Sequence, residues 1–394
     1  MLFNKKANKL YVRFCLSMMA FFNLNCVKAE DFPDPHSAAD AFLSGLVSSN
    51  RAPGVQYVLV DREKTLYRFH AGLADLRTKK SVDDTTTFNG YSITKTFTAA
   101  AVVKLALEGK IDLDAPLKQY LKELPQAQSP TVRQTLQHVA GFPNPNPLPW
   151  VHRADRHTTF DEQAFVRRLI QEYPELDFKP GEKFSYSNIG YLLLGELVHR
   201  VSGMSFEQYV MTEIIQPLNL NKNQKISFTI SDPDHHAYGY IRRWYWLNLF
   251  LGLFISREKF LSGSIDGWVP FNHLYVDGKA YGGLVGNAAG FARYLQVMLQ
   301  RQKPFSQEML DMMWTPGKTN AGEQTRSGLS WFYGELNGQR YFTHSGGAGG
   351  YYCEIRIYPD INLASVIMTN NTGISAQHYL DNIDRFFIAG EKSP

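Results

Sequence analysis

Residues 88–110 read FNGYSITKTFTAAAVVKLALEGK and carry the clearest structural signal in the chain. The small and aliphatic side chains of residues 98–107 are typical of a buried helix. The turn pair Asn89-Gly90 precedes this run, and Gly109 follows it as a suitable C-cap. The pattern therefore predicts a core helix that starts shortly after a tight turn.

A hydroxyl and an ammonium share the first turn of this expected helix. Ser92 and Lys95 are three residues apart, so their side chains lie on one face. The Ser92 hydroxyl lies beside unpaired backbone N–H groups at the positive end of the helix dipole. Burial disfavours the charged form of Lys95, so its amine can act as a base that activates a serine nucleophile. The tetrapeptide alone is weak, because Ser-x-x-Lys is most often a plain helix start and recurs at Ser256-Arg257-Glu258-Lys259 in a charged context.

The composition is that of an ordinary globular protein. The chain has 394 residues, of which 44% are hydrophobic and 20% charged. This length can bury a full core and predicts one large domain or two closely joined domains. Aromatic residues make up 13% of the chain, which argues against disorder.

Residues 1–29 have the pattern of a secretory signal peptide. A basic stretch precedes an apolar run at residues 14–22, and Val27-Lys28-Ala29 offers small residues ahead of a cleavage point. We therefore expect an exported protein, periplasmic or secreted, with one folded domain at residues 30–394. An uncleaved anchor that keeps the protein at a membrane is the alternative.

Removal of this leader changes the charge and the cysteine content. The leader contains five cations and no acidic residue, so the formal net charge falls from +4 to −1 without it. The remaining domain gives no indication of nucleic-acid binding. Two of the three cysteines leave with the leader, and we interpret the remaining Cys353 as a small buried hydrophobe with no disulfide partner.

Strand patterns lie at both ends of the chain, and helical patterns lie between them. The expected strands are residues 55–61, 65–70, 340–343, 351–358 and 363–369. Besides the Ser92 helix, the expected helices are residues 36–49, 131–139, 160–172, 189–202, 291–299 and 376–388. We therefore expect an α+β fold of the three-layer α/β/α-like sandwich type. Its antiparallel sheet is built from both chain ends and flanked by helices, with a mainly helical subdomain inserted at about 111–275.

One stretch of this insertion, residues 241–261, is unusually apolar. Its centre, Trp244 to Ile255, is flanked by cations and is too short to span a bilayer. Three interpretations are open. The stretch is a buried hairpin or helix, an interfacial patch that makes peripheral membrane contact, or a hydrophobic lid over the substrate cleft.

Two further motifs carry chemistry. Tyr186-Ser187-Asn188 lies on a loop before an expected helix. An ammonium nearby favours the charged form of the phenol, so Tyr186 can relay protons. The Asn188 amide can bind a substrate amide. His344-Ser345-Gly346-Gly347 lies at the end of an expected strand. There a glycine lets a substrate backbone lie close, and a backbone N–H, that of Gly347 for preference, can join the Ser92 N–H in an oxyanion hole. His344 and Ser345 are candidates to hold a carboxylate or carbonyl of the substrate.

The order Ser-x-x-Lys, Tyr-x-Asn and Lys/His-Thr/Ser-Gly resembles the penicillin-recognising serine hydrolases. These comprise class C β-lactamases, serine D-alanyl-D-alanine carboxypeptidases and related esterases and aminopeptidases. The similarity covers roughly Asp34 to Ile388. Residues 136–142, LQHVAGF, are similar to the family's helix-ending Leu-x-x-His-x-x-Gly-Leu, in which we interpret His138 as structural. Pro180-Gly181 and Gly282-Gly283-Leu284-Val285 match the family context as well.

The resemblance implies an acyl-enzyme mechanism that needs no metal or organic cofactor. Ser92 attacks a carbonyl, and Lys95 and Tyr186 move the hydroxyl proton to the leaving group. The N–H groups of Ser92 and Gly347 stabilise the oxyanion, with Asn188 and the His344-Ser345-Gly346 segment binding the substrate. Water activated by the same pair then releases the acyl group.

One position departs from the dedicated class C β-lactamases, which carry lysine where this chain has His344. Histidine, with an ordinary pKa of about 6.5, is mostly neutral at neutral pH and anchors an anionic drug weakly. We therefore expect a D-Ala-peptidase or esterase with weak or no β-lactamase activity, acting on a small molecule or peptide such as a cell-wall peptide, an ester or a β-lactam. A true β-lactamase is the first alternative. A non-catalytic module that binds cell-wall peptides or a membrane is the second, although the intact motifs disfavour it.

Overall fold

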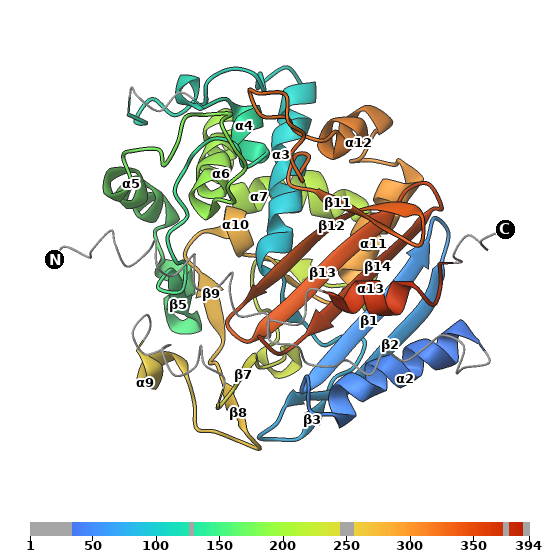
Figure 1. Cartoon of the computed structure of the whole chain (residues 1–394). Helices are drawn as coiled ribbons and strands as arrows, with labels where there is room; N and C mark the ends of the chain where they lie inside the picture. The colour runs from blue at the N-terminus through green and yellow to red at the C-terminus, as the bar shows by residue number, and fades with distance from the viewer. Residues whose placement is uncertain (1–33, 126–129, 245–255, 373–377, 389–394) are drawn as a thin grey trace.

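The computed structural model describes residues 34–125, 130–244, 256–372 and 378–388 (Figure 1). The expected signal peptide and the apolar centre of the insert at 245–255 lie outside the described residues. Within the described ranges, no helix is both long enough and apolar enough to cross a membrane.

A seven-stranded antiparallel sheet forms the centre of the molecule, in the order β11-β12-β13-β14-β1-β2-β3 (Figure 1). Its strands are β1 (Gly54–Asp61), β2 (Thr65–Asp75), β3 (Lys80–Ser81), β11 (Phe332–Leu336), β12 (Gln339–Ala348), β13 (Tyr351–Tyr358) and β14 (Leu363–Thr369). The first long strand, β1, pairs with the last, β14, so Val58 lies opposite Val366. The expectation that both chain ends build one sheet is confirmed.

Helices cover both faces of this sheet, as the burial of β1 shows. Val55, Tyr57 and Leu59 join the core under α2 (Pro35–Ser48) and α13 (Tyr379–Asp384). The alternate residues Val58 and Val60 join the larger core on the other face. Because successive side chains of a strand point to opposite faces, a strand between two helical layers carries apolar residues on both faces. The α+β sandwich expected from the sequence is confirmed.

The larger core contains α3 (Thr94–Leu107), which the sequence predicted as a buried helix. It lies with α11 (Ala288–Gln300) and α12 (Gln307–Trp314) on the face of the sheet opposite α2 and α13 (Figure 1). We call this the inner face. The other α-helices of the described residues are α4 (Val132–Leu136), α5 (Glu162–Glu172), α6 (Asn188–Ser202), α7 (Phe206–Val210), α9 (Arg257–Phe260) and α10 (Lys279–Gly282). Helix α4 begins with a capping box between Thr131 and Gln134, which fixes where this helix starts.

Several elements differ from the sequence prediction. Strand β11 was not predicted, β12 extends to Ala348 instead of ending at 343, and α13 ends at Asp384. Short strands also join distant segments of the chain, and none was predicted. They are β4 (Phe88–Asn89), β10 (Val285–Gly286) and β6 (Ile226–Ser227) in one sheet, β5 (Val151–Arg153) with β9 (Leu274–Val276), and β7 (Tyr240–Arg242) with β8 (Trp268–Pro270). Such short strands exist only through their partners, so no local pattern marks them.

The described flanks of the apolar insert form a small core of their own. Ile241, Phe260 and Leu261 pack there with Phe271 and neighbouring apolar residues. The side chain of Trp244, the last described residue before the insert, is 79% exposed.

Candidate active site

Ser92 lies on a 3₁₀ turn, Tyr91–Ile93, directly before α3 rather than within its first α-helical turn. Tyr91 has a φ of 45°, a left-handed conformation that side chains larger than glycine rarely adopt. Two contacts hold this turn: the Gly90 N–H donates to the Leu284 carbonyl (2.7 Å), and the Cys353 thiol donates to the Gly90 carbonyl (2.8 Å). Cys353 is fully buried, as its sequence context predicted, and it also anchors the nucleophile turn to β13.

Lys95 lies beneath Ser92 and is fully buried. Its Nζ donates to Asn188 Oδ1 (2.8 Å) and the Tyr281 carbonyl (2.7 Å), and it lies within hydrogen-bond distance of Ser92 Oγ (3.2 Å). Burial lowers the pKa of Lys95 well below its ordinary value. The charged form is therefore disfavoured relative to an exposed lysine, and the neutral form of the amine can take the proton of the adjacent Ser92 hydroxyl.

Tyr186 lies on the loop before α6, close to the same amine. Lys95 Nζ is 4.9 Å from the centre of the Tyr186 ring. Burial raises the pKa of Tyr186, and a hydrogen bond with Ser92 only partly offsets this effect. The expectation that a nearby ammonium favours the phenolate is thus corrected, because burial disfavours both charges. Tyr186 holds its proton, which suits it as a proton donor.

His138 fixes the Tyr186 loop from behind. Its ring stacks on the Tyr186 ring, with centroids 4.3 Å apart. Its Nδ1 accepts from the Ser187 N–H (3.1 Å), and its carbonyl accepts from the Ser185 N–H (2.8 Å). Both neighbours of Tyr186 are therefore tied to one residue, which agrees with the interpretation of His138 as structural.

Strand β12 carries the third motif, and its residues alternate between the two faces of the sheet. His344 is buried on the inner face, where its Nδ1–H donates to the Ser345 carbonyl (2.8 Å). Burial, together with the nearby Lys95, lowers the pKa of His344 to about 3, so the ring is neutral at neutral pH. Ser345 lies on the opposite face and borders a separate hollow beside Glu354 and Arg356.

The two glycines of this motif have different surroundings. A Cβ on Gly346 would lie 2.2 Å from the Gly90 carbonyl oxygen and 2.8 Å from the Ser92 nitrogen. Glycine is thus needed here because the nucleophile turn packs directly on β12. The nearest atom to a Cβ on Gly347 would be 3.4 Å away. Among the described strands, β11 pairs with β12 only as far as Thr343. The edge of β12 beyond Thr343, which includes Gly347, is therefore not covered by β11.

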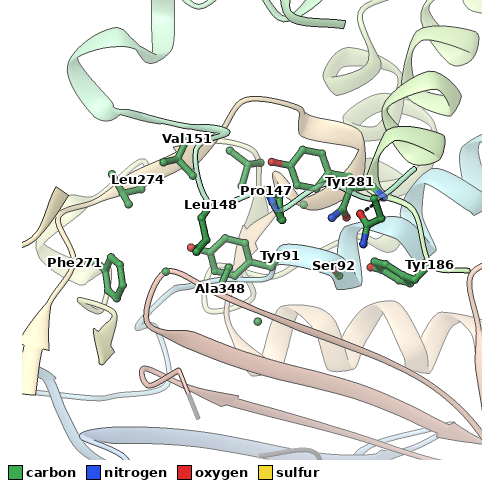
Figure 2. A pocket seen from close by; sticks show the side chains of 16 residues that line it. Tyr91, Ser92, Pro147, Leu148, Val151, Tyr186, Phe271, Leu274, Tyr281 and Ala348 are labelled. Atoms are coloured by element: carbon green, nitrogen blue, oxygen red, sulfur yellow. Dashed lines mark hydrogen bonds between the residues drawn. The ribbon is translucent and has the colours of Figure 1, made fainter. Parts of the chain in front are cut away.

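A cavity of about 290 Å³ opens above the nucleophile (Figure 2). Of the residues predicted from the sequence, Ser92, Tyr186, Asn188 and Gly347 line it. Lys95 lies beneath them, and His344, Ser345 and Gly346 are not part of the lining. Sequence reasoning missed the remaining lining residues, which are Tyr91, Asn144, Pro147, Leu148, Val151, Phe271, Leu274, Val276, Tyr281, Gly282, Ala348 and Gly349. None of the described lining residues is charged.

Asn188 joins the cavity to the buried amine. Its Oδ1 accepts from Lys95, and its backbone N–H donates to Asn144 Oδ1 (3.0 Å). The rival tetrapeptide begins at the exposed Ser256, directly before α9, and does not line this cavity. Within the described ranges, no cluster of three or more His, Cys, Asp or Glu side chains has the arrangement to hold a metal ion.

The fold is a sandwich in which a serine and a buried lysine lie at the start of one core helix and a tyrosine lies on the loop before another. This combination defines the class of β-lactamase-like serine hydrolases. The sequence model of the Beta-lactamase family matches residues 39–388, and the chain therefore belongs to this family. Its members are serine hydrolases that act through an acyl-enzyme. The resemblance drawn from the three motifs is confirmed.

Individual proteins agree with this assignment. Penicillin-binding protein 4* of Bacillus subtilis (strain 168) is 26% identical over 310 residues, which are 77% of this chain but only 65% of that protein. The octameric penicillin-binding protein homologue from Pyrococcus abyssi has a TM-score of 0.71 at 23% identity, covering 88% of this chain and 76% of that one. A class C β-lactamase has a TM-score of 0.70 at 17% identity, covering 94% and 99%. At these identities the two solved structures show the fold alone.

Proposed function

We propose that the protein is a serine hydrolase that forms an acyl-enzyme on Ser92. The observation that carries this proposal is the hydrogen-bonded cluster of Ser92, Lys95 and Asn188 at one end of the cavity, with Tyr186 beside it. A nucleophile, a buried amine and a protonated phenol in one cluster supply the parts that acyl transfer needs.

The proposed reaction has two halves, acylation of Ser92 and hydrolysis of the acyl-enzyme, and the same groups act in both. The Lys95 amine takes the Ser92 proton as Oγ attacks the substrate carbonyl, and the N–H groups of Ser92 and Gly347 stabilise the oxyanion. Tyr186 gives its proton to the leaving group and regains one from Lys95. Water then attacks the acyl-enzyme by the same route, which releases a carboxylic acid and restores Ser92.

Electrostatics favour an uncharged substrate. No charged side chain is found among the described lining residues, and His344, at the position of the β-lactamase lysine, is neutral and behind the wall. A carboxylate in the cavity would therefore lose its hydration without gaining an ion pair. Esters and amides that are neutral near the scissile bond are the preferred class, ahead of D-Ala-D-Ala peptides and β-lactams.

The test is the intact mass of the full chain after incubation with a neutral ester, a D-Ala-D-Ala peptide and a chromogenic cephalosporin. We expect an acyl adduct or turnover with the ester that is lost in Ser92→Ala, and at most slow reaction with the cephalosporin. Cephalosporin turnover far above the other two would instead identify a β-lactamase. A chain that forms no adduct with any of the three and turns none of them over would contradict a hydrolase.

We also propose that the protein is exported and that it contacts a membrane peripherally. The leader pattern of residues 1–29 supports export, and mass spectrometry of the N-terminal residue of the protein from fractionated cells tests it. The exposed Trp244, with the Arg243 guanidinium 5.1 Å from its ring, supports a peripheral membrane contact of Trp244 to Ile255. Trp244→Ala should then weaken sedimentation with anionic vesicles, and unchanged sedimentation would contradict the contact.

A further inference from the structure

The cavity has a second part that the proposed reaction does not use. We define the apolar arm as the lining residues on the far side of the cavity from Tyr186. They are Pro147, Leu148, Val151, Phe271 and Leu274, together with Val276, which pairs with Val151 across two strands (Figure 2). All six side chains are hydrocarbon, so this part of the cavity offers no side-chain hydrogen bond to a substrate.

Paired strands build the wall of this arm. Val151 on β5 lies opposite Val276 on β9, and both side chains face the cavity. The other side of the same ribbon is fastened by a chain of polar contacts, in which His152 bonds Asp277 (2.8 Å) and His157 (3.0 Å). The wall is therefore held from behind and does not depend on a ligand for its shape.

The end wall of the arm is also packed from behind. Phe271 and Leu274 are buried, and together with Leu148 and Val151 they contact the small core that contains Ile241. An apolar cavity with such backing stays open and favours an apolar occupant, because no polar group is left unpaired when water leaves.

The arm and the proton donor lie on opposite sides of the nucleophile. Figure 2 shows Tyr186 on one side of Ser92, and Val151, Leu274 and Phe271 on the other side, beyond Tyr91 and Ala348. The leaving group has to meet Tyr186 to receive its proton. A substrate bound at Ser92 therefore directs its acyl part, and not its leaving group, toward the arm.

We propose that the apolar arm is an acyl pocket, which selects esters and amides with an uncharged aliphatic or aromatic acyl group. This inference rests on the proposed function for its chemistry. The ester or amide bond to the leaving group breaks, and a bond from the acyl carbon to Ser92 Oγ forms. The departing alcohol or amine takes its proton from Tyr186, and the Ser92 proton replaces that one by way of Lys95. Water then breaks the acyl–Ser92 bond and releases the acid. The acyl group of the substrate remains in the arm until that step.

Two ester series on the full chain test this assignment. In 4-nitrophenyl esters from acetyl to decanoyl, kcat/KM should rise about fourfold per methylene, the equivalent of about 0.8 kcal/mol, until the arm is full. In acetate esters of alcohols of increasing length, kcat/KM should show no comparable rise. A flat acyl series, or a rise with alcohol length instead, would overturn the acyl pocket.

Variants locate the effect. Leu148→Trp should lower the ratio of octanoyl to acetyl kcat/KM by at least tenfold, because the indole fills the arm. Phe271→Ala should shift the best acyl group toward longer chains. The matched control is Leu107→Trp, at the exposed end of α3 away from the cavity, which should keep the wild-type ratio. Equal ratios in Leu148→Trp and wild type would count against the arm.

A binding measurement separates this inference from the proposed function. Calorimetric titration of Ser92→Ala with octanamide and acetamide needs no turnover. If no ester is hydrolysed but octanamide binds more tightly than acetamide and Leu148→Trp removes the difference, the arm stands and the hydrolase fails. If esters are hydrolysed through Ser92 with no preference for acyl length and the two amides bind alike, the hydrolase stands and the arm fails.

Discussion

At the scale of single residues, the fold controls the ionisation of Lys95 most directly. Its amine is held by Ser92, Asn188 and the Tyr281 carbonyl in a site closed to water. Burial lowers its pKa in the folded chain, whereas the unfolded chain keeps the ordinary value of about 10.4. Between these two pKa values the unfolded chain binds a proton that the folded chain lacks.

This difference predicts how stability changes with pH. The free energy of unfolding should rise as pH increases toward about 10, by at most about 1.4 kcal/mol per pH unit from this one group. Lys95→Met removes the titrating amine. The free energy of unfolding of wild type should therefore increase relative to that of the variant as pH rises. Urea unfolding of both proteins from pH 6 to 10 measures the gap. The exposed Lys122→Met is the control, and its free energy of unfolding should change with pH as that of wild type does. A difference between wild type and Lys95→Met that stays constant with pH would contradict a buried neutral amine.

His344 gives a prediction for activity. Its pKa of about 3 means that it stays neutral over the working range of an ester hydrolase. His344→Gln should therefore leave the midpoint of the acid limb of kcat/KM unchanged between pH 5 and 9, even if the rate itself falls. The pH profiles of both proteins with one neutral ester provide the measurement. A midpoint that moves by a full pH unit in the variant would show that His344 ionises in the working enzyme.

At the scale of elements, the contact between β12 and the nucleophile turn sets the geometry of the site. Gly346 has no room for a Cβ beside the Gly90 carbonyl and the Ser92 N–H. Gly346→Ala should push the strand away from Ser92. We expect a fall in kcat/KM of about 10²-fold, since small displacements of reacting groups cost this much, and a loss of about 1–3 kcal/mol in the free energy of unfolding from overpacking.

Gly347→Ala serves as the stability control for that variant, because its Cβ would meet only ordinary contacts. Its free energy of unfolding should stay close to that of wild type. Equal stability of the two alanine variants, with an active Gly346→Ala, would mean that the strand does not pack on the turn.

The same elements show which features a sequence can predict. The helix of residues 98–107 and the spacing of Ser92 and Lys95 are local patterns, so both were predicted. The extension of β12 was not, because two glycines lower strand propensity and only pairing with β13 keeps them extended. The Tyr281 carbonyl that binds Lys95 has no side-chain signature at all. The apolar arm joins residues 147–151 to residues 271–276, and their contact arises only in the folded chain.

At the scale of the whole molecule, a buried carboxylate joins the two ends of the chain. Asp384 on α13 accepts hydrogen bonds from Tyr57 on β1 (2.7 Å), Tyr358 on β13 (2.8 Å) and Ser365 on β14 (2.7 Å). Tyr57 and Asp384 are 327 residues apart in the sequence. The C-terminal helix thus holds a sheet whose central strands come from opposite ends of the chain.

Removing this carboxylate should destabilise the molecule as a whole. Asp384→Ala leaves three buried hydroxyls without their acceptor, and we expect the free energy of unfolding to fall by at least about 2 kcal/mol. The exposed Asp360→Ala, which removes only a surface ion pair with Arg340, should stay within about 1 kcal/mol of wild type in its free energy of unfolding.

The effect of Asp384 on stability should also depend on pH. Burial raises its pKa to about 6, so between about pH 4 and 6 the folded chain holds a proton that the unfolded chain lacks. The advantage of wild type over Asp384→Ala should therefore shrink as pH rises through this window and stay constant above it. Urea unfolding of wild type and Asp384→Ala at pH 4, 5, 6 and 7 measures this advantage, and one that grows over the same range would show that Asp384 ionises more readily in the folded chain than in the unfolded one.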